Sequence, residues 1–198
     1  AVDINLGGLA RNLGNPTERL ITFKADGGVS GIVAERADVA EALGKQITLD
    51  VDGEWRAGQP IKLAQADIAG NGLSLKLAGD IAESVFNGTI AVDAASIAPF
   101  GALAGRDLAG KLDLDARGTV TPVGGGFDLT IDGSGNGLAI GATALDNLLQ
   151  GETKLAGRVA RGENGLVADK LRIFNEQVEI AADGRYATGE ANFTFDTM

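Results

Sequence analysis

The residue types that carry out most protein chemistry are scarce in this sequence. Its 198 residues include no histidine and no cysteine. This inventory excludes thiol nucleophiles, cysteine-based zinc sites, histidine-ligated haem and Ser-His-Asp triads. Ser30, which Gly31 follows directly, does not lie in a nucleophile-elbow motif and has no histidine to activate it.

Carboxylates are the remaining candidates for chemistry, and several come in pairs. These pairs are Asp50 with Asp52, Asp113 with Asp115, and Asp128 with Asp132. Glycoside hydrolysis needs two carboxyl groups in a cleft with separated pKa values, whereas these occupy the polar positions of alternating stretches. The stretch GGGFDL at 124–129 matches only part of a calcium-binding nonapeptide and has no tandem copy. We therefore predict no catalytic residue, no metal site and no cofactor.

Phosphate and nucleic-acid binding are disfavoured as well. Gly44-Lys45 lacks the upstream glycine of a P-loop, and GSGNG at 133–137 is one glycine short of a dinucleotide fingerprint. The chain has 17 basic and 27 acidic residues, a formal net charge of −10. Nucleic-acid binding depends on Lys and Arg neutralising phosphates, so we predict no nucleic-acid partner and interpret the acidic excess as a solubilising surface.

The elements that hold these residues are predicted to be β-strands with one apolar face. Apolar and polar residues alternate with period two, which places each apolar set on one side of a pleated strand. We expect this side to line an apolar groove, and the polar side to face water as in an antiparallel sheet or a coiled β-structure. The predicted groove-lining residues are Ile47, Leu49, Val51, Leu73, Leu75, Leu77, Ile90, Val92, Leu112, Leu114, Val120, Phe127, Leu129, Ile131, Leu171, Ile173, Val178, Ile180, Phe193 and Phe195.

Turn signals divide these strands into many short pieces. Asp-Gly occurs at 26–27, 52–53, 132–133 and 183–184, and Asn-Gly at 71–72, 87–88, 136–137 and 164–165. Because these residues tolerate positive φ, we predict tight hairpin turns there and about twelve to fifteen strands in all.

Three stretches that do not alternate are predicted to form short helical excursions. They are residues 33–44, which Gly44 would end, residues 95–104, and residues 142–150.

The whole chain, residues 1–198, is predicted to be a single elongated β-segment. Hydrophobic residues make up 44% of the sequence, but only 5% of it is aromatic and 30 residues are glycine, so a compact core would be thin. LAGKLDLDARG at 108–118 is echoed by GETKLAGRVARG at 151–162, which indicates units that each rest on a neighbour. The first and last residues are strand-like, and we expect the chain to be a piece of a longer protein.

From residue 86 onward the order of motifs resembles one known family. FNGTIAVDAASIAPFGALAGRDLAGKLDLDARGTVTPVGGGFDLTIDG, followed by LAIGATALDNLLQGETKLAGRVARGENGL, is similar to the TamB family of translocation and assembly module proteins of Gram-negative bacteria. The likeness lies in the succession of APF, LAGR, the VTP-GGG stretch, LLQGETKL and the DKLRI strand.

The resemblance implies a fold, a cellular location and a function. TamB-like proteins belong with the AsmA-like bridge-type lipid transfer proteins, whose sheets curl into an apolar trough called a β-taco. The implied function is to carry phospholipid acyl chains between the inner and outer membranes and to support outer-membrane assembly with a TamA-like barrel partner. The implied location is the periplasm, with attachment to the inner membrane through a segment outside this chain. The family has no catalytic residue to carry over, so we expect no enzyme.

Two other functions fit the same residues. An open sheet edge beside an apolar surface could bind nascent, unfolded outer-membrane proteins by β-augmentation, as a chaperone does. Alternatively, a β-solenoid filled by its own side chains would be an inert spacer without a ligand. The shape of the apolar interior, open or filled, separates the spacer from the other two.

Overall fold

The computed structural model describes residues 1–33, 35–163, 165–187 and 190–197, the last range as backbone only, and it is dominated by one β-sheet. The strands are β1 (Val2–Arg11), β2 (Leu20–Ser30), β3 (Gln46–Arg56), β4 (Ile61–Gly70), β5 (Leu73–Ala82), β6 (Val85–Ala94), β7 (Ala109–Thr121), β8 (Gly126–Ala139), β9 (Glu152–Gly162), β10 (Gly165–Phe174), β11 (Glu179–Ala187) and β12 (Glu190–Thr197). The helical segments are α1 (Ala37–Leu43), the 3₁₀ turn η1 (Ala98–Phe100), α2 (Gly101–Ala104) and α3 (Thr143–Leu148).

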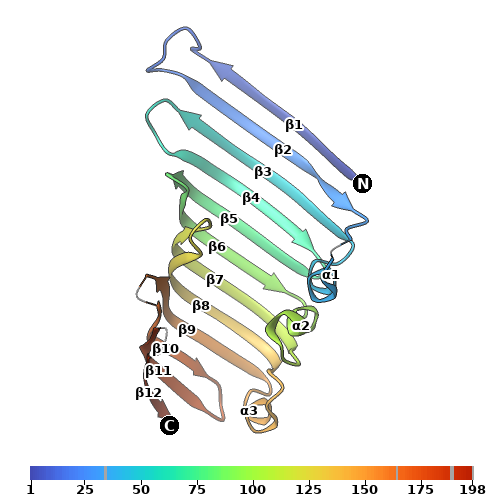
Figure 1. The fold of residues 1–198 in the computed structure, drawn as a ribbon, viewed down its shortest axis with the longest axis vertical. Helices are drawn as coiled ribbons and strands as arrows, with labels where there is room; N and C mark the ends of the chain where they lie inside the picture. Colours follow the sequence, from blue (N-terminus) through green and yellow to red (C-terminus); the bar gives the residue numbers. More distant parts are fainter. Residues whose placement is uncertain (34, 164, 188–189, 198) are drawn as a thin grey trace.

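The twelve strands form a single antiparallel meander. Each strand pairs with the strands before and after it in sequence, so the order in the sheet is the order in the chain (Figure 1). Among the described residues β1 and β12 pair only with β2 and β11, and the sheet therefore stays open. The prediction of an all-β fold with a few short helices is confirmed. Of the two predicted arrangements, an antiparallel sheet and a coiled β-structure, the meander is an antiparallel sheet.

The pairing register sorts the strand residues onto two faces. Residues directly opposite each other in an antiparallel pair share a face, so faces can be followed from strand to strand. Leu114 lies opposite Val92 on β6, which lies opposite Leu75 on β5, and so on across the sheet. We call the face that carries Leu114 the trough face. The opposite face carries Asp113 and is called the wet face.

The prediction that Asp-Gly pairs form hairpin turns is wrong. All four lie inside strands, namely β2, β3, β8 and β11. The reason is the same period of two: each Asp faces water and each Gly takes the next position, on the trough face. Asn-Gly forms the β4–β5 turn at 71–72, but 87–88 and 136–137 lie within β6 and β8, and residue 164 lies outside the described residues.

The two rims of the sheet differ in the length of their connections. One rim, here called the turn rim, carries the connections 12–19, 57–60, 83–84 and 122–125, none of which contains a helix. The other, the helix rim, carries the three predicted helical excursions, and α1, α2 and α3 all lie along it (Figure 1). The helix predicted over 33–44 does end at Gly44, whose φ of 67° favours glycine. The echoed stretches 108–118 and 151–162 include β7 and β9, each of which follows a helical connection.

Hydrogen bonds from side chains fasten the helix rim to the sheet. Asn71, in the β4–β5 turn, donates from Nδ2 to the carbonyl oxygens of Glu41 and Ala42, at 2.6 and 3.2 Å, at the end of α1. Thr153, at the start of β9, is 1% exposed and donates from Oγ1 to the Leu149 carbonyl, which follows α3. These bonds satisfy carbonyls that a helix end leaves unpaired.

The sheet has very little closed core. Within the described part of the chain, the buried apolar residues are Ala42, Ala66, Phe86, Ala94, Ala116, Ile131 and Leu149. The molecule exposes 12430 Å². A compact monomer of 20.1 kDa would expose about 8,700 Å². The excess is that of a single-layer sheet whose apolar face is largely uncovered.

Candidate functional site

The trough face is the candidate site, and the register places the predicted lining residues on it. All of the twenty predicted residues except Val178 occupy trough-face positions of their strands. Val178 lies before β11 in the β10–β11 connection, where its N–H bonds the Oδ1 of Asn175 at 3.0 Å. Phe193 and Phe195 are in register with Gly184 and Ala182, and their side chains lie outside the described residues.

The trough face also includes residues that the alternation did not identify. A bulge in β4 changes the parity, so Ile61 and Leu63 share the face with Ala66 and Ile68. The other large apolar residues that were missed are Val2, Ile4, Leu6, Ile21, Phe23, Val29, Ile81, Phe86, Leu155, Val159 and Leu166, together with Trp55. Most of these residues have a glycine or alanine nearby in the same strand, which obscures the alternation of apolar and polar residues. Pairing each strand with a neighbour whose apolar face was already identified is the signal that could have found them.

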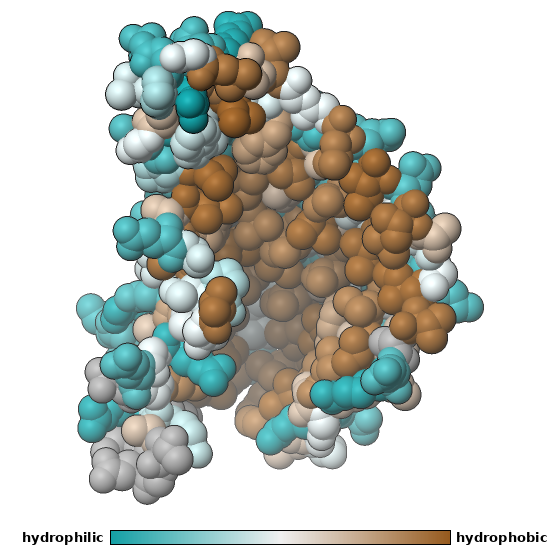
Figure 2. Space-filling view, turned by 45° about the horizontal axis from the view of Figure 1, so that its top comes forward, coloured by the Kyte–Doolittle hydropathy of each residue, from teal (hydrophilic) through white to brown (hydrophobic). Residues whose placement is uncertain are grey.

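The trough face is hollowed and open. Figure 2 shows a concave surface lined mainly by apolar side chains, with polar side chains at its margins. Apart from Ile131, which is buried, the predicted lining residues with described side chains are only half-buried. Twelve strands at a spacing of about 4.8 Å give a contour of about 50 Å along the trough. From Leu112 to Val120 its floor spans about 27 Å along a strand, at about 3.4 Å per residue.

Glycines form part of the trough floor. Gly79, Gly88 and Gly118 lie side by side on β5, β6 and β7. A Cβ on Gly118 would lie 2.0 Å from the carbonyl oxygen of Asp128 on β8, and one on Gly79 would lie 2.3 Å from that of Asn87. Gly118 has φ +147° and Gly79 +159°, which side chains rarely adopt. The strands can therefore approach closely on the concave side, as curvature requires.

Aromatic rings cover two of the trough-face glycines, Gly53 and Gly88. The Phe23 Cζ lies 2.4 Å from where a Cβ on Gly53 would be, and the Phe86 Cζ lies 2.8 Å from that position on Gly88. A side chain on either glycine would displace the ring above it. The floor is therefore packed locally, while the space above it remains open.

The wet face holds most of the charged strand residues. Arg158 on β9 donates from Nε and Nη2 to both carboxylate oxygens of Asp128 on β8, each at 2.7 Å. These hydrogen bonds, with a smaller electrostatic contribution, lower the pKa of Asp128, although its partial desolvation opposes the shift. Both side chains are about half exposed, at 44% and 48%, so the pair adds little stability.

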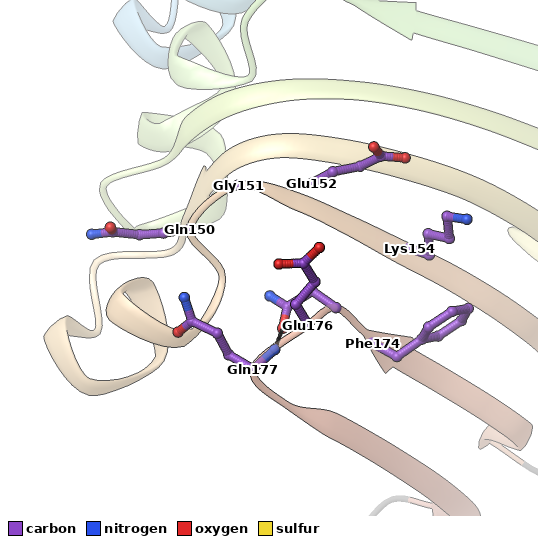
Figure 3. Close-up of a pocket in the computed structure, with 8 residues that line it drawn as sticks. Gln150, Gly151, Glu152, Lys154, Phe174, Glu176 and Gln177 are labelled. Atoms are coloured by element: carbon purple, nitrogen blue, oxygen red, sulfur yellow. Dashed lines mark hydrogen bonds between the residues drawn. The ribbon is translucent and has the colours of Figure 1, made fainter.

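A polar cleft of about 480 Å³ lies on the β9–β10 side of the helix rim (Figure 3). Glu152, Lys154 and Phe174 line it from wet-face positions, and Gln150 and Gln177 line it from the connections. It combines charges of both signs with one aromatic ring. In the described part of the chain no group of three Asp or Glu residues is arranged to hold a metal ion.

Comparison with known proteins returns no match to a family model, a curated protein or a solved structure. No helix among the described residues is long and apolar enough to cross a membrane. The geometry of the trough therefore carries the functional argument.

Proposed function

We propose that the chain is the periplasmic part of a TamB-like bridge protein, and that its trough carries phospholipid acyl chains between two membranes in support of outer-membrane assembly. The observation that carries this proposal is the half-exposed apolar face that continues across the sheet. A contiguous exposed apolar surface of this extent is typical of a binding site. The order of motifs from residue 86 onward, similar to that of the TamB family, supports the same proposal.

The energetics suit a hydrocarbon cargo. Each buried methylene contributes about 0.8 kcal/mol, so a chain of about sixteen carbons gains on the order of 10 kcal/mol. Headgroups can stay in water at the rim, which avoids the cost of burying charge. Because neighbouring strands present similar apolar surfaces, a tail can move along the trough without meeting one deep binding site.

A substitution on the floor tests the proposal. Leu129→Asp places a carboxylate where two or three methylenes of a tail would rest, a loss of about 2 kcal/mol, which weakens binding about 30-fold. Thr130→Asp is the matched control, because Thr130 is the next residue and is exposed on the wet face. The affinity of each variant for a fluorescent fatty acyl probe is measured. Equal affinities for the two variants, or unfolding of Leu129→Asp as in a filled solenoid, would contradict an open lipid-binding trough.

One observation favours chaperone-like binding of unfolded outer-membrane proteins as a second candidate. Val2, Ile4 and Leu6 on the edge strand β1 are 69%, 42% and 81% exposed. An extended peptide with alternating apolar residues could pair with β1 and lay its apolar side beside them. A barrel-strand peptide that competes with the acyl probe, and loses affinity when proline replaces Ile4, whose N–H faces away from β2 at the open edge, would support this candidate.

A further inference from the structure

Among the strand residues with described side chains, the paired positions of the trough face carry one charge. Arg161, on β9, lies opposite Phe127 on β8 and Leu166 on β10, both of which are trough-face residues. Among the strand residues whose side chains the structure describes, every other paired trough-face position is uncharged. Arg161 is exposed, and within the described residues no carboxylate forms an ion pair with it.

Arg161 lies in the row of trough residues nearest the turn rim. The same row contains Trp55 on β3 and Tyr186 on β11, the latter opposite Leu166 and 52% exposed. Trp, Tyr and Arg each combine an apolar body with a polar end, and such residues are typical of a boundary between hydrocarbon and water. The Arg161 Nη1 lies 4.0 Å from where a Cβ on Gly125 would be, above the β7–β8 turn.

Toward the opposite rim the trough floor is buried over part of its length, on β6, β8 and β9. Ala94 and Thr153, in the row nearest the helix rim, are 3% and 1% exposed, and Leu149 beside α3 is buried as well. At β9 an amphiphile in the trough therefore has one end where a polar group can reach water, at Arg161, and another where it meets packed protein, at Thr153. The floor spans about 27 Å along the strands, which exceeds the roughly 15 Å of hydrocarbon that one leaflet contributes to a bilayer.

We infer that the trough holds an anionic phospholipid along the strands, with its phosphate at Arg161 on the turn rim and its tails directed toward the helix rim. This inference rests on the proposed function and adds a headgroup preference and an orientation to it. The chain has a net charge of −10, so the attraction for an anion must be local. A guanidinium is suited to a phosphate because its planar fork can donate two parallel hydrogen bonds.

The test is a competition between two headgroups. The protein is incubated with vesicles of equal phosphatidylglycerol and phosphatidylcholine with identical tails, then isolated, and its bound lipid is quantified by mass spectrometry. We expect phosphatidylglycerol to be enriched about fivefold, as for one exposed charge pair. Arg161→Gln should return the ratio to that of the vesicles while the total bound lipid stays the same.

Arg117→Gln is the control, because Arg117 is an exposed arginine on the wet face of β7. It should leave the enrichment unchanged. Equal loss in both variants, or bound lipid without enrichment in the unmodified protein, would overturn the headgroup site and leave the acyl-chain proposal standing. An unmodified protein that takes up neither phosphatidylglycerol nor phosphatidylcholine would overturn both the headgroup site and the acyl-chain proposal.

Discussion

Adding a single methyl group to Gly118 should destabilise the sheet far more than its size suggests. The new Cβ would lie 2.0 Å from the Asp128 carbonyl oxygen and 3.2 Å from the Leu129 Cα. Both atoms belong to the backbone of β8, so no side-chain rotation can relieve the overlap. The strands β7 and β8 would have to separate, or β7 would have to leave the φ of +147° that it adopts there.

The loss in free energy of unfolding caused by Gly118→Ala can be estimated from two contributions. A side chain held in a sparsely populated backbone region costs about 1–3 kcal/mol, and overpacking costs typically about 1–3 kcal/mol more. Gly118→Ala should therefore lower the free energy of unfolding by about 2–6 kcal/mol. This is a large part of the 5–15 kcal/mol that is typical of folded domains.

Urea denaturation followed by circular dichroism measures the change. Gly7→Ala in β1 is the matched control, because a Cβ at Gly7 has no atom within 4 Å. It should change stability by less than about 0.5 kcal/mol. If Gly118→Ala proved as mild as Gly7→Ala, the close approach of β7 and β8 on the trough face, and the role of these glycines in its curvature, would be refuted.

Two further predictions concern side-chain hydrogen bonds, one set at the helix rim and one on the wet face. Asn175→Ala removes the bonds from Nδ2 to the Leu148 carbonyl and Thr153 Oγ1, and those that Oδ1 accepts from the Gln177 and Val178 N–H groups. We expect a loss of about 1–3 kcal/mol, seen as a melting temperature lower by about 3–10 °C, and little change for the exposed Asn147→Ala. Because Arg158 lowers the pKa of Asp128 in the folded state, this pair stabilises the protein above the unfolded-state pKa of about 4, and the effect is lost as pH falls below it. Asp128→Asn should therefore cost less than about 1 kcal/mol at pH 7, and a cost that stayed constant down to pH 2 would contradict this assignment.

Much of the trough could be predicted from the sequence because its strands follow a strict period of two. Leu112 and Leu114 alternate with Lys111 and Asp113, and the sheet places them on opposite faces. Assigning these residues to two faces needs only the geometry of a pleated strand, and no knowledge of the strands that pair with it. The helical segments could also be predicted, since Gly44 ends α1 as its conformational freedom allows.

The Asp-Gly pairs show where local reasoning failed. In Asp132-Gly133 the aspartate lies on the wet face and the glycine on the trough face, opposite Leu114. A Cβ on Gly133 would lie 2.4 Å from the Asp113 carbonyl oxygen. The glycine is therefore required by the neighbouring strand, a long-range cause that turn propensity does not contain.

Bulges were the second source of error. The shift between Leu63 and Ala66 reverses the parity of β4, and one between Ala168 and Leu171 does the same in β10. Lys170 has φ 49°, and its N–H bonds the Asp183 carboxylate at 2.7 Å. A bulge of this kind depends on the neighbouring strand, so the sequence of one strand alone does not locate it.

The most direct test of the central claim is photo-crosslinking to phospholipid at adjacent residues of β7. A photoreactive amino acid replaces Leu114, on the trough face, or Asp115, on the wet face. The protein is then incubated with phospholipid vesicles and irradiated, and lipid adducts are measured by mass spectrometry. We expect adducts at 114 and not at 115. Equal labelling at both positions, or none at 114, would contradict a trough that binds acyl chains.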